Sequence, residues 1–241
     1  MMVRLAELPQ AGRTITSIPL RATLASALAV GAGGSSGSLA DKPLLKDAFG
    51  RLIIPGSQLK GRLRHECEKL ARGLGWAICR SPDPERMCPQ REGSAGNFHR
   101  PEYQVEGYAG SHCLVCQIFG NPALPARLWV EDLVCEVPPA ALEPTLRPGV
   151  TLNRRRRTAE DQRLYLIETS PAAELTFSGS LQLLPDCPSW GKTLLLAALH
   201  HLIALGGSKS AGLGWLHWDP GSLQALQPTA ADWAFLAQGG S

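Results

Sequence analysis

The fold is decided by one stretch, Ile53-Ile54-Pro55-Gly56-Ser57-Gln58-Leu59-Lys60-Gly61-Arg62-Leu63-Arg64, in which an apolar strand end passes through a Pro-Gly turn directly into a basic helix. Ser57 is suited to cap this helix, because its hydroxyl can accept a hydrogen bond from a free N–H group of the first turn. Apolar residues then recur at three- and four-residue steps, which predicts a helix over Ser57–Leu74 with one face inward. The inward positions are Leu59, Leu63, Cys67, Leu70 and Leu74.

A second face of this helix is basic. Ser57, Lys60 and Arg64 stand at i, i+3 and i+7 and share a stripe beside the positive end of the helix dipole. Free N–H groups and basic side chains at a helix start suit a phosphate group, and Arg62 adds charge nearby. The alternative is a capped helix whose charges simply face water.

Composition narrows the class of protein. The net charge of the 241 residues is only +3, so affinity for a nucleic acid would have to come from local clusters of basic residues. Met1–Ser17 lacks the apolar core of a secretory signal, and the longest apolar run, Leu194–Leu205, is too short to cross a membrane. We therefore expect a soluble cytoplasmic protein with no membrane partner. In that reducing compartment, the seven cysteines favour metal binding over disulfides.

Strand-like segments flank the basic helix. They are Thr16–Val30, Arg127–Val137, Glu174–Leu184 and Leu213–Trp218. A second helix is predicted over Ser189–Leu205, capped by Ser189, and the tail beyond Gln224 is informative only in a helical pattern over Ala230–Ala237. The inward residues of the helix over Ser189–Leu205 are Leu194, Leu195, Ala198, Leu202 and Leu205. The order predicts an α+β fold with a ferredoxin-like (RRM-like) split βαβ core, a plan used by many RNA-binding domains.

A protruding hairpin is predicted after the proline-rich connection Pro138–Pro148. Apolar stretches at 150–153 and 164–167 enclose a polar tip that runs to Gln162 and contains Arg154, Arg155, Arg156 and Arg157. Four adjacent guanidinium groups repel one another unless an anion is near, and arginine planes can stack on an unstacked base. The alternative is a solubilising loop paired with Glu160 and Asp161.

The segment Trp76–Gly120 lacks apolar periodicity and carries the cysteines Cys79, Cys88, Cys113 and Cys116, separated by eight, twenty-four and two residues. Four thiolates satisfy a tetrahedral structural zinc, and the closing C-x-x-C offers two of them from one turn. Metal binding would then order a segment that has little core of its own. Alternative ligands are His65, Cys67, His99 and His112, although Cys67 is expected to pack on the first helix; free buried thiols are the other interpretation.

A glycine-rich loop spans Gly206–Gly214. A nucleotide-binding phosphate loop needs a strand before it and a helix after it, whereas here a helix precedes and a strand follows, so the order of elements argues against a nucleotide triphosphate site. Around Gly207, Lys209 and Ser210, backbone N–H groups could still approach a phosphate while the lysine supplies charge. A helix C-cap followed by a tight turn is the alternative.

Four motifs now stand in a specific order: 53–64, Cys116-Gln117-Ile118-Phe119-Gly120, Gly149–Glu168 and Gly206–Gly214. In this order the chain resembles the RAMP superfamily, specifically the repeated backbone subunit of type III CRISPR RNA-guided effector complexes, and most closely its zinc-bearing subfamilies. The resemblance runs from about Thr16 to Trp218. It implies one RAMP domain over 1–241, with a zinc-binding insertion at 76–120, a thumb at 138–168 and a C-terminal tail at 219–241.

The resemblance also implies partners and an activity. In that family several copies or paralogues stack along a guide RNA (crRNA) with further effector subunits, and each thumb wedges between the guide and the target RNA. The basic helix and the glycine-rich loop would hold the guide backbone. Some members cut the target, using an aspartate between the first strand and the first helix, and Asp41 in Leu39-Ala40-Asp41-Lys42-Pro43 matches that position.

RNA cleavage by a 2′-hydroxyl needs a base, or a divalent cation such as Mg²⁺ or Mn²⁺, at the phosphate, and the Asp41 carboxylate could supply either need. Asp47, in Asp47-Ala48-Phe49-Gly50, is better explained by turn formation. The leading hypothesis is therefore a guide-binding subunit that is also an endoribonuclease. The alternatives are a structural subunit in which Asp41 is inert, and a guide-processing enzyme that uses histidines. The candidate histidines are His65, His99, His112, His200 and His201.

Overall fold

A computed structural model describes residues 15–31, 40–90 and 98–240. Its main sheet is antiparallel, with strand order β2–β4–β7–β1–β8, and β3 pairs with β7 beside β4. The strands are β1 (Thr16–Leu24), β2 (Ile53–Ile54), β3 (Leu128–Val130), β4 (Leu133–Cys135), β7 (Thr176–Leu183) and β8 (Leu216–Trp218). This mixture of helices and antiparallel strands confirms the α+β class predicted from the sequence.

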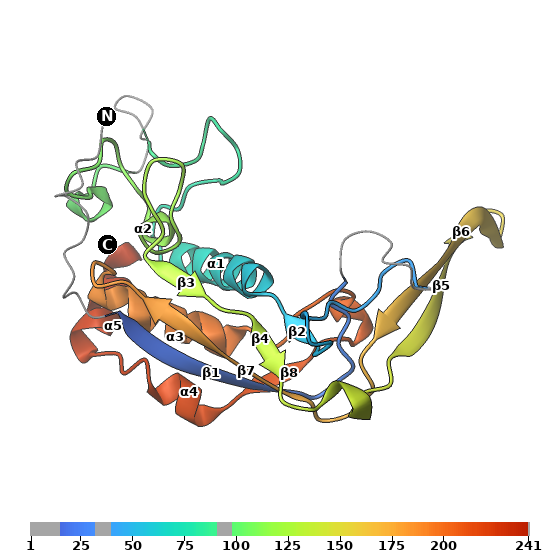
Figure 1. Cartoon of the computed structure of the whole chain (residues 1–241). Coiled ribbons are helices and arrows are strands. Elements are labelled where there is room, and N and C mark those ends of the chain that lie inside the picture. The colour runs from blue at the N-terminus through green and yellow to red at the C-terminus, as the bar shows by residue number, and fades with distance from the viewer. Residues whose placement is uncertain (1–14, 32–39, 91–97, 241) are drawn as a thin grey trace.

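The core lies between one face of the sheet and two helices, α1 (Gly56–Gly73) and α3 (Ser189–His201), which lie side by side (Figure 1). Side chains of a strand alternate between its two faces. On β1, Ile18, Leu20 and Ala22 are accordingly buried, while Pro19 and Arg21 are exposed. The expected inward residues of α3 are all buried, including those beyond its last turn.

The start of α1 differs from the prediction. The helix begins at Gly56 after Pro55, and Ser57 makes no capping hydrogen bond. The Gly56 N–H group instead donates to Asp132 Oδ1 at 2.7 Å, so a carboxylate from a distant loop meets the positive end of the helix. Leu59, Leu63 and Cys67 are buried as predicted, whereas Leu74 follows the last helical residue and is exposed, so its predicted inward position is wrong.

Several predicted boundaries are too long, because tertiary contacts replace regular structure at the ends. The first strand stops at Leu24, not Val30, and the chain then turns to contact three loops. The predicted strand Arg127–Val137 is broken at 131–132, where the Asp132 carbonyl passes so close to Gly179 that a Cβ there would lie 2.5 Å away. α3 ends at His201 instead of Leu205, and the last strand begins at Leu216 instead of Leu213.

The tail contributes to the core. It forms α4 (Pro220–Gln224), α5 (Ala230–Ala237), as the sequence pattern predicted, and a short 3-10 turn. A reciprocal pair of hydrogen bonds between Thr229 and Asp232 caps α5. The ring of Phe235 stacks on Trp76 and on Trp190, with centroids 5.2 and 5.5 Å apart, so the tail joins α3 to the cysteine-bearing segment.

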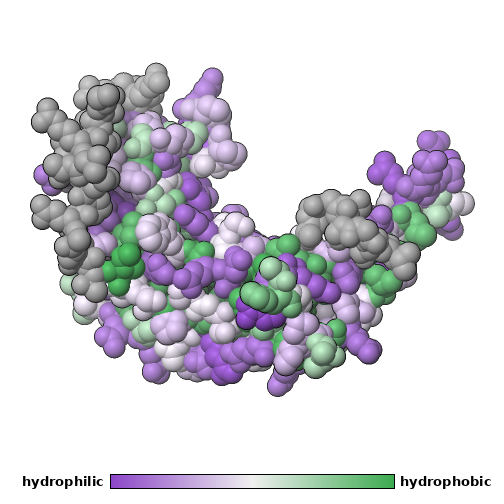
Figure 2. All heavy atoms as spheres, in the orientation of Figure 1, coloured by the Kyte–Doolittle hydropathy of each residue, from purple (hydrophilic) through white to green (hydrophobic). Residues whose placement is uncertain are grey.

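Two projections rise from opposite ends of the molecule (Figure 1). One is the hairpin of β5 (Thr145–Asn153) and β6 (Thr158–Thr169), which forms a separate two-stranded sheet. The other is the cysteine-bearing segment, which contains a 3-10 turn at Pro101–Tyr103 and the helix α2 (Leu114–Phe119). The space-filling view shows the surface hollowed between them (Figure 2). Among the described helices, none has the length and apolarity needed to cross a membrane.

The predicted hairpin is present, but its strands and its turn have other boundaries than predicted. Its turn is Arg154–Arg157, and residues 158–162, predicted as part of the tip, already belong to β6. The proline-rich connection is also shorter than predicted, because β5 begins at Thr145 and Pro148 pairs with Leu166 inside the hairpin. An isolated two-stranded sheet can accept a proline, since its outer edge needs no N–H donor.

Candidate metal centre and nucleic-acid surface

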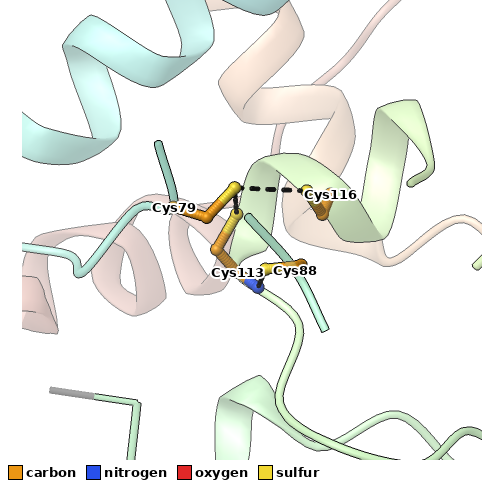
Figure 3. Close-up of side chains that lie close together, drawn as sticks. All are labelled: Cys79, Cys88, Cys113 and Cys116. Carbon is orange, nitrogen blue, oxygen red and sulfur yellow. Dashed lines mark hydrogen bonds between the residues drawn. The ribbon is translucent and has the colours of Figure 1, made fainter. Parts of the chain in front are cut away.

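The four predicted cysteines meet at one point (Figure 3). All four are buried, and their sulfur atoms lie within 4.8 Å of one another. The Sγ atom of Cys79 lies 3.6 Å from that of Cys116 and 3.7 Å from that of Cys113. Zinc–sulfur bonds of about 2.3 Å in a tetrahedron require sulfur atoms about 3.8 Å apart, so the donor set and its spacing fit a structural zinc.

Local structure brings these thiols together. Cys113 immediately precedes α2 and Cys116 lies in its first turn, so one turn supplies two sulfurs. The chain around Cys88 is held beside them by paired backbone hydrogen bonds between Gln90 and Ser111, 2.9 and 3.0 Å long. The Cys113 N–H group donates to Cys88 Sγ at 3.2 Å. Hydrogen bonds from Cys113 and then Cys116 lower the pKa of the Cys79 thiol below its ordinary value.

The alternative ligands lie outside this cluster. His65 and His99 are exposed, and the buried ring of His112 meets the Asn121 side chain through Nδ1 at 2.9 Å. Cys67 packs in the core, as predicted, with its thiol 3.8 Å from the Leu194 carbonyl. Among the described residues, the four-cysteine group is the one cluster with metal-ligand geometry.

The basic side chains of α1 make contacts within the protein and do not all point into solvent. Lys60 Nζ donates to the Leu128 carbonyl at 3.3 Å, and burial, followed by repulsion from Arg64, lowers the pKa of Lys60. Arg62 pairs with Glu66 at 3.0 Å. Arg64 reaches the cysteine cluster, with Nη2 3.3 Å from Cys116 Sγ. Ser57 is exposed.

The hairpin tip is an ordered basic turn. The Asn153 side chain accepts hydrogen bonds from the N–H groups of Arg155 and Arg156, both 3.0 Å long. Arg156 also pairs with Glu160 at 3.0 Å, so the solubilising-loop interpretation holds for one arginine. For the other three, no salt bridge occurs within the described part of the chain. Hydrophilic side chains accordingly gather at the free end of this projection (Figure 2).

The glycine-rich loop is fixed both by hydrogen bonds to residues 27–29 and by hydrogen bonds within the loop. The Gly207 N–H group donates to Ala29 O at 2.7 Å, and the Gly214 N–H group donates to Ala27 O at 2.8 Å. Lys209 Nζ turns back onto the Gly206 carbonyl at 2.8 Å, within the loop. The alternative of a helix C-cap in this loop is wrong, because α3 ends at His201 and is capped at Leu202. Gly207 and Ser210 are exposed, and for the N–H groups of Lys209 and Ser210 the described residues offer no backbone acceptor.

Asp41 lies at the base of the hairpin. Its carboxylate is exposed, and Oδ2 accepts a hydrogen bond from the Leu166 N–H group of β6 at 2.7 Å. Lys42 forms a parallel β-bridge with Ile167 of β6. The Glu168 carboxylate, also on β6, accepts a hydrogen bond from the Leu44 N–H group at 2.7 Å. Asp41 Oδ1 has no hydrogen-bond partner among the described residues. The preceding residues 32–39 lie outside the described residues.

Asp47 forms a local turn, as predicted. Its Oδ1 atom accepts hydrogen bonds from the N–H groups of Phe49 and Arg51, both 2.9 Å long, and Oδ2 accepts from the Arg51 guanidinium at 2.7 Å. Desolvation would raise the pKa of Asp47, but the hydrogen bonds from Arg51 and Phe49 outweigh it and lower the pKa.

Sequence reasoning missed three contacts. They are the Asp132 cap of α1, the Glu168–Leu44 contact at the hairpin base, and the approach of Arg64 to Cys116. The partners are separated by 76, 124 and 52 residues, so no local spacing signals them. The histidines of the guide-processing hypothesis do not form a group: His200 and His201 are exposed at the end of α3 and not part of the core.

Comparison with known proteins identifies the class. A family model of the RAMP superfamily matches residues 21–217, most of the chain, and the protein therefore belongs to the RAMP superfamily. The chain is also similar to the CRISPR system Cms endoribonuclease Csm3 of Methanocaldococcus jannaschii, with 31% identity over 97 residues. That match covers 38% of this chain and 30% of the length of the relative.

Proposed function

We propose that this protein is a guide-RNA-binding backbone subunit of a type III CRISPR effector and that it also cleaves the bound target RNA. The observation that carries the proposal is a hairpin with a basic tip and an exposed carboxylate at its base, in a chain of the RAMP superfamily. Similarity to a protein named as a CRISPR endoribonuclease supports it. So does the strand order β8–β1–β7–β4, which follows the ferredoxin-like split βαβ plan if β3 and β4 count as one strand.

In this proposal the hairpin is the thumb, within 138–168. Its tip arginines meet RNA, because three of their guanidinium groups form no ion pair with a described residue and four adjacent charges attract a polyanion. Ser57, Lys60, Arg62, Gly207, Lys209 and Ser210 contact the guide backbone. Such contacts position the RNA without reading its sequence. The partners are then crRNA, target RNA, further copies or paralogues, and other effector subunits.

The cysteine cluster would hold one structural zinc and thereby order the insertion 76–120. Cys79, Cys88, Cys113 and Cys116 are the ligands, since their sulfurs already have the separation that a tetrahedral site requires. The ion closes a segment whose two ends lie far apart in sequence. Its role is structural, because four protein ligands leave no open position for a substrate.

Cleavage would proceed by in-line attack. The 2′-hydroxyl of the nucleotide before the cut loses its proton and its oxygen attacks the adjacent phosphorus. The bond to the 5′-oxygen breaks, giving a 2′,3′-cyclic phosphate and a 5′-hydroxyl. Asp41 would take that proton or hold a divalent cation, Mg²⁺ or Mn²⁺, that stabilises the charge developing on the phosphate. Its Oδ1 atom, which has no hydrogen-bond partner among the described residues, would serve either task.

The test is a comparison of Asp41→Asn with Asp41→Ala in the assembled complex. Asparagine keeps an oxygen that can accept the Leu166 N–H bond but removes the charge, so target binding should persist while cutting is lost. The Asp41→Ala complex should also lose cutting, and the base of its hairpin should be less firmly held because the bond from the Leu166 N–H group is missing. Asp47→Ala is the matched control, because its carboxylate serves a local turn, and it should keep cutting.

The second candidate function is that of a structural subunit of the same complex, in which this chain itself cuts no RNA and cleavage takes place elsewhere. One observation favours it: the Asp41 carboxylate already serves as a hydrogen-bond acceptor for β6, which gives it a structural role. Full cutting by the Asp41→Asn complex would support this candidate and would contradict the catalytic role.

A further inference from the structure

The Arg64 guanidinium donates three hydrogen bonds, two of them to the cysteine-bearing segment and one to a glutamate of its own helix. Nη2 donates to Cys116 Sγ at 3.3 Å, Nη1 donates to the Gly120 carbonyl at 3.0 Å, and Nε donates to Glu68 Oε1 at 3.2 Å. Its side chain is only 24% exposed. The guanidinium is therefore turned toward the cysteine cluster and not toward open solvent.

The two contacts with the cysteine-bearing segment fall on one short helix. Cys113 and Cys116 come from the start of α2, and Gly120 is the residue that ends it. A cation at the C-terminal end of a helix meets free carbonyl groups and the negative end of the helix dipole. Arg64 thus contacts the carbonyl of the residue that caps the C-terminal end of α2 and a sulfur of its first turn, and it links both to α1.

Charge gives a second reason for this contact. Four thiolates around a divalent ion leave a net charge of about −2 in a site whose ligands are all buried. An uncompensated buried charge is strongly unfavourable. Among the described residues, Arg64 is the one cationic side chain that donates a hydrogen bond to a cysteine sulfur of the cluster, whereas Arg72 donates to the backbone carbonyl of Cys79 at 3.2 Å. Glu68, one helical turn away, holds the guanidinium from the other side.

We propose that Arg64 is a positioning residue of the cysteine metal centre, which it stabilises by a hydrogen bond to Cys116 and by partial neutralisation of the thiolate charge, and that it is not a contact for the guide RNA. This inference rests on the proposed zinc site. It reassigns Arg64 from the phosphate-binding stripe in which the sequence alone had placed it. Groups that orient a ligand from outside the coordination sphere commonly change metal affinity by about 10–100-fold when they are replaced.

The test uses the full-length protein with Arg64→Gln and Arg64→Lys. Arg62→Gln is the matched control, because Arg62 lies on the same helix and pairs with Glu66, without a contact to the cluster. Zinc affinity is measured by competition with a chromophoric chelator, and the sulfur-to-metal charge-transfer band is recorded after Co²⁺ replaces zinc. We expect Arg64→Gln to bind zinc about 10-fold or more weakly and to shift the Co²⁺ band. Arg64→Lys should lose less zinc affinity, and Arg62→Gln should keep the zinc affinity and the Co²⁺ band of the wild type while its guide affinity falls.

RNA binding distinguishes the two roles of Arg64. The salt dependence of guide affinity should be unchanged in zinc-loaded Arg64→Gln, because a lost phosphate contact would reduce its slope by about 1. Wild-type zinc affinity and an unshifted Co²⁺ band in both variants would overturn the proposal, as would a reduced slope. If Arg64→Gln fails to fold, the same measurements on Arg64→Lys decide. Wild-type protein that takes up no Co²⁺ would refute the zinc site itself and this inference with it.

Discussion

Gly214→Ala should destabilise the protein strongly, and the reason lies in the closing residue of the glycine-rich loop. Gly214 has a φ of +72°, and a Cβ atom there would lie 1.8 Å from the Leu205 carbonyl oxygen. Its carbonyl accepts from the Leu205 N–H group at 2.9 Å, while its own N–H group donates to Ala27 at 2.8 Å. The added methyl group therefore cannot be accommodated unless the two backbone segments separate.

The magnitude follows from these contacts. The left-handed conformation costs an alanine about 1–2 kcal/mol. Separating the segments breaks or weakens two hydrogen bonds, and a buried group left unpaired costs about 1–3 kcal/mol. Together they predict a loss of about 2–5 kcal/mol, and the upper part of this range is typical of severe mechanisms such as strain and broken buried networks. Gly212→Ala is the control: its φ is +85°, but its Cβ would meet open space, so only the conformational cost of about 1–2 kcal/mol applies.

The assay is urea unfolding of the zinc-loaded protein, followed by circular dichroism, with thermal unfolding as a check. For a chain of this length, about 1 kcal/mol corresponds to roughly 2–4 °C in Tm. The Tm of Gly214→Ala should fall by about 4–20 °C and that of Gly212→Ala by about 2–8 °C, with guide binding retained in the second variant. Equal losses of stability in the two variants would refute the reasoning, because they would show that the contact with Leu205 contributes nothing.

Three further predictions concern the metal and the RNA. The purified protein should contain about one zinc per chain, and joint replacement of Cys113 and Cys116 by serine should remove the zinc and unfold the insertion, as measured by elemental analysis and proteolysis; full zinc content in that variant would contradict the site. Arg155→Ala should lower the slope of log affinity for RNA against log salt by about 1, whereas Arg156→Ala should change it less because Glu160 already pairs with Arg156; equal slopes would contradict this assignment. Target cutting should stop when a chelator removes free divalent cations at constant zinc content, and a deoxynucleotide before the cut should block it, so cutting of that deoxy substrate would exclude the 2′-hydroxyl as nucleophile.

Periodicity and composition were sufficient for the parts of the fold that depend on neighbours in sequence. The apolar spacing in α1 predicted the buried face at Leu59, Leu63 and Cys67, and alternation predicted β7 within one or two residues of its ends. The C-x-x-C pair pointed to the cluster because two thiols three positions apart can share one turn. The hairpin was predictable from two apolar runs around a charged tip.

The remaining features depend on contacts between distant segments. Ser57 is a residue type that often caps helices. Asp132 takes that role instead, because the loop between β3 and β4 brings a carboxylate, a stronger acceptor, to the Gly56 N–H group. Arg64 has the spacing of a phosphate ligand, yet its side chain finds a sulfur. No pattern in the tail indicated that Phe235 would stack between two tryptophans. Spacing gives the face on which a side chain stands but not its partner across the fold.

Sheet topology explains why the proposed RNA-facing segments gather at one end of the molecule. β1 and β4 end where β7 and β8 begin, since Thr23 pairs with Thr176, Cys135 with Phe177 and Leu24 with Leu216. The three connections at that end carry Asp41, the hairpin and the glycine-rich loop. Residues 27–30 join them, because Leu28 exchanges hydrogen bonds with Ser170, Ala29 binds the Gly207 N–H group, and Val30 binds the Leu45 N–H group.

This junction also explains the shortened first strand. Residues 25–31 have the apolar composition of a strand, but their carbonyl groups are needed by three different loops and cannot all face one neighbouring strand. The chain therefore leaves the sheet after Leu24 and remains buried at Ala27, Leu28 and Val30. A change at Gly214 would reach Asp41 through this segment, because the Gly214 N–H group binds Ala27 while the Val30 carbonyl holds Leu45, four residues from the proposed catalytic carboxylate.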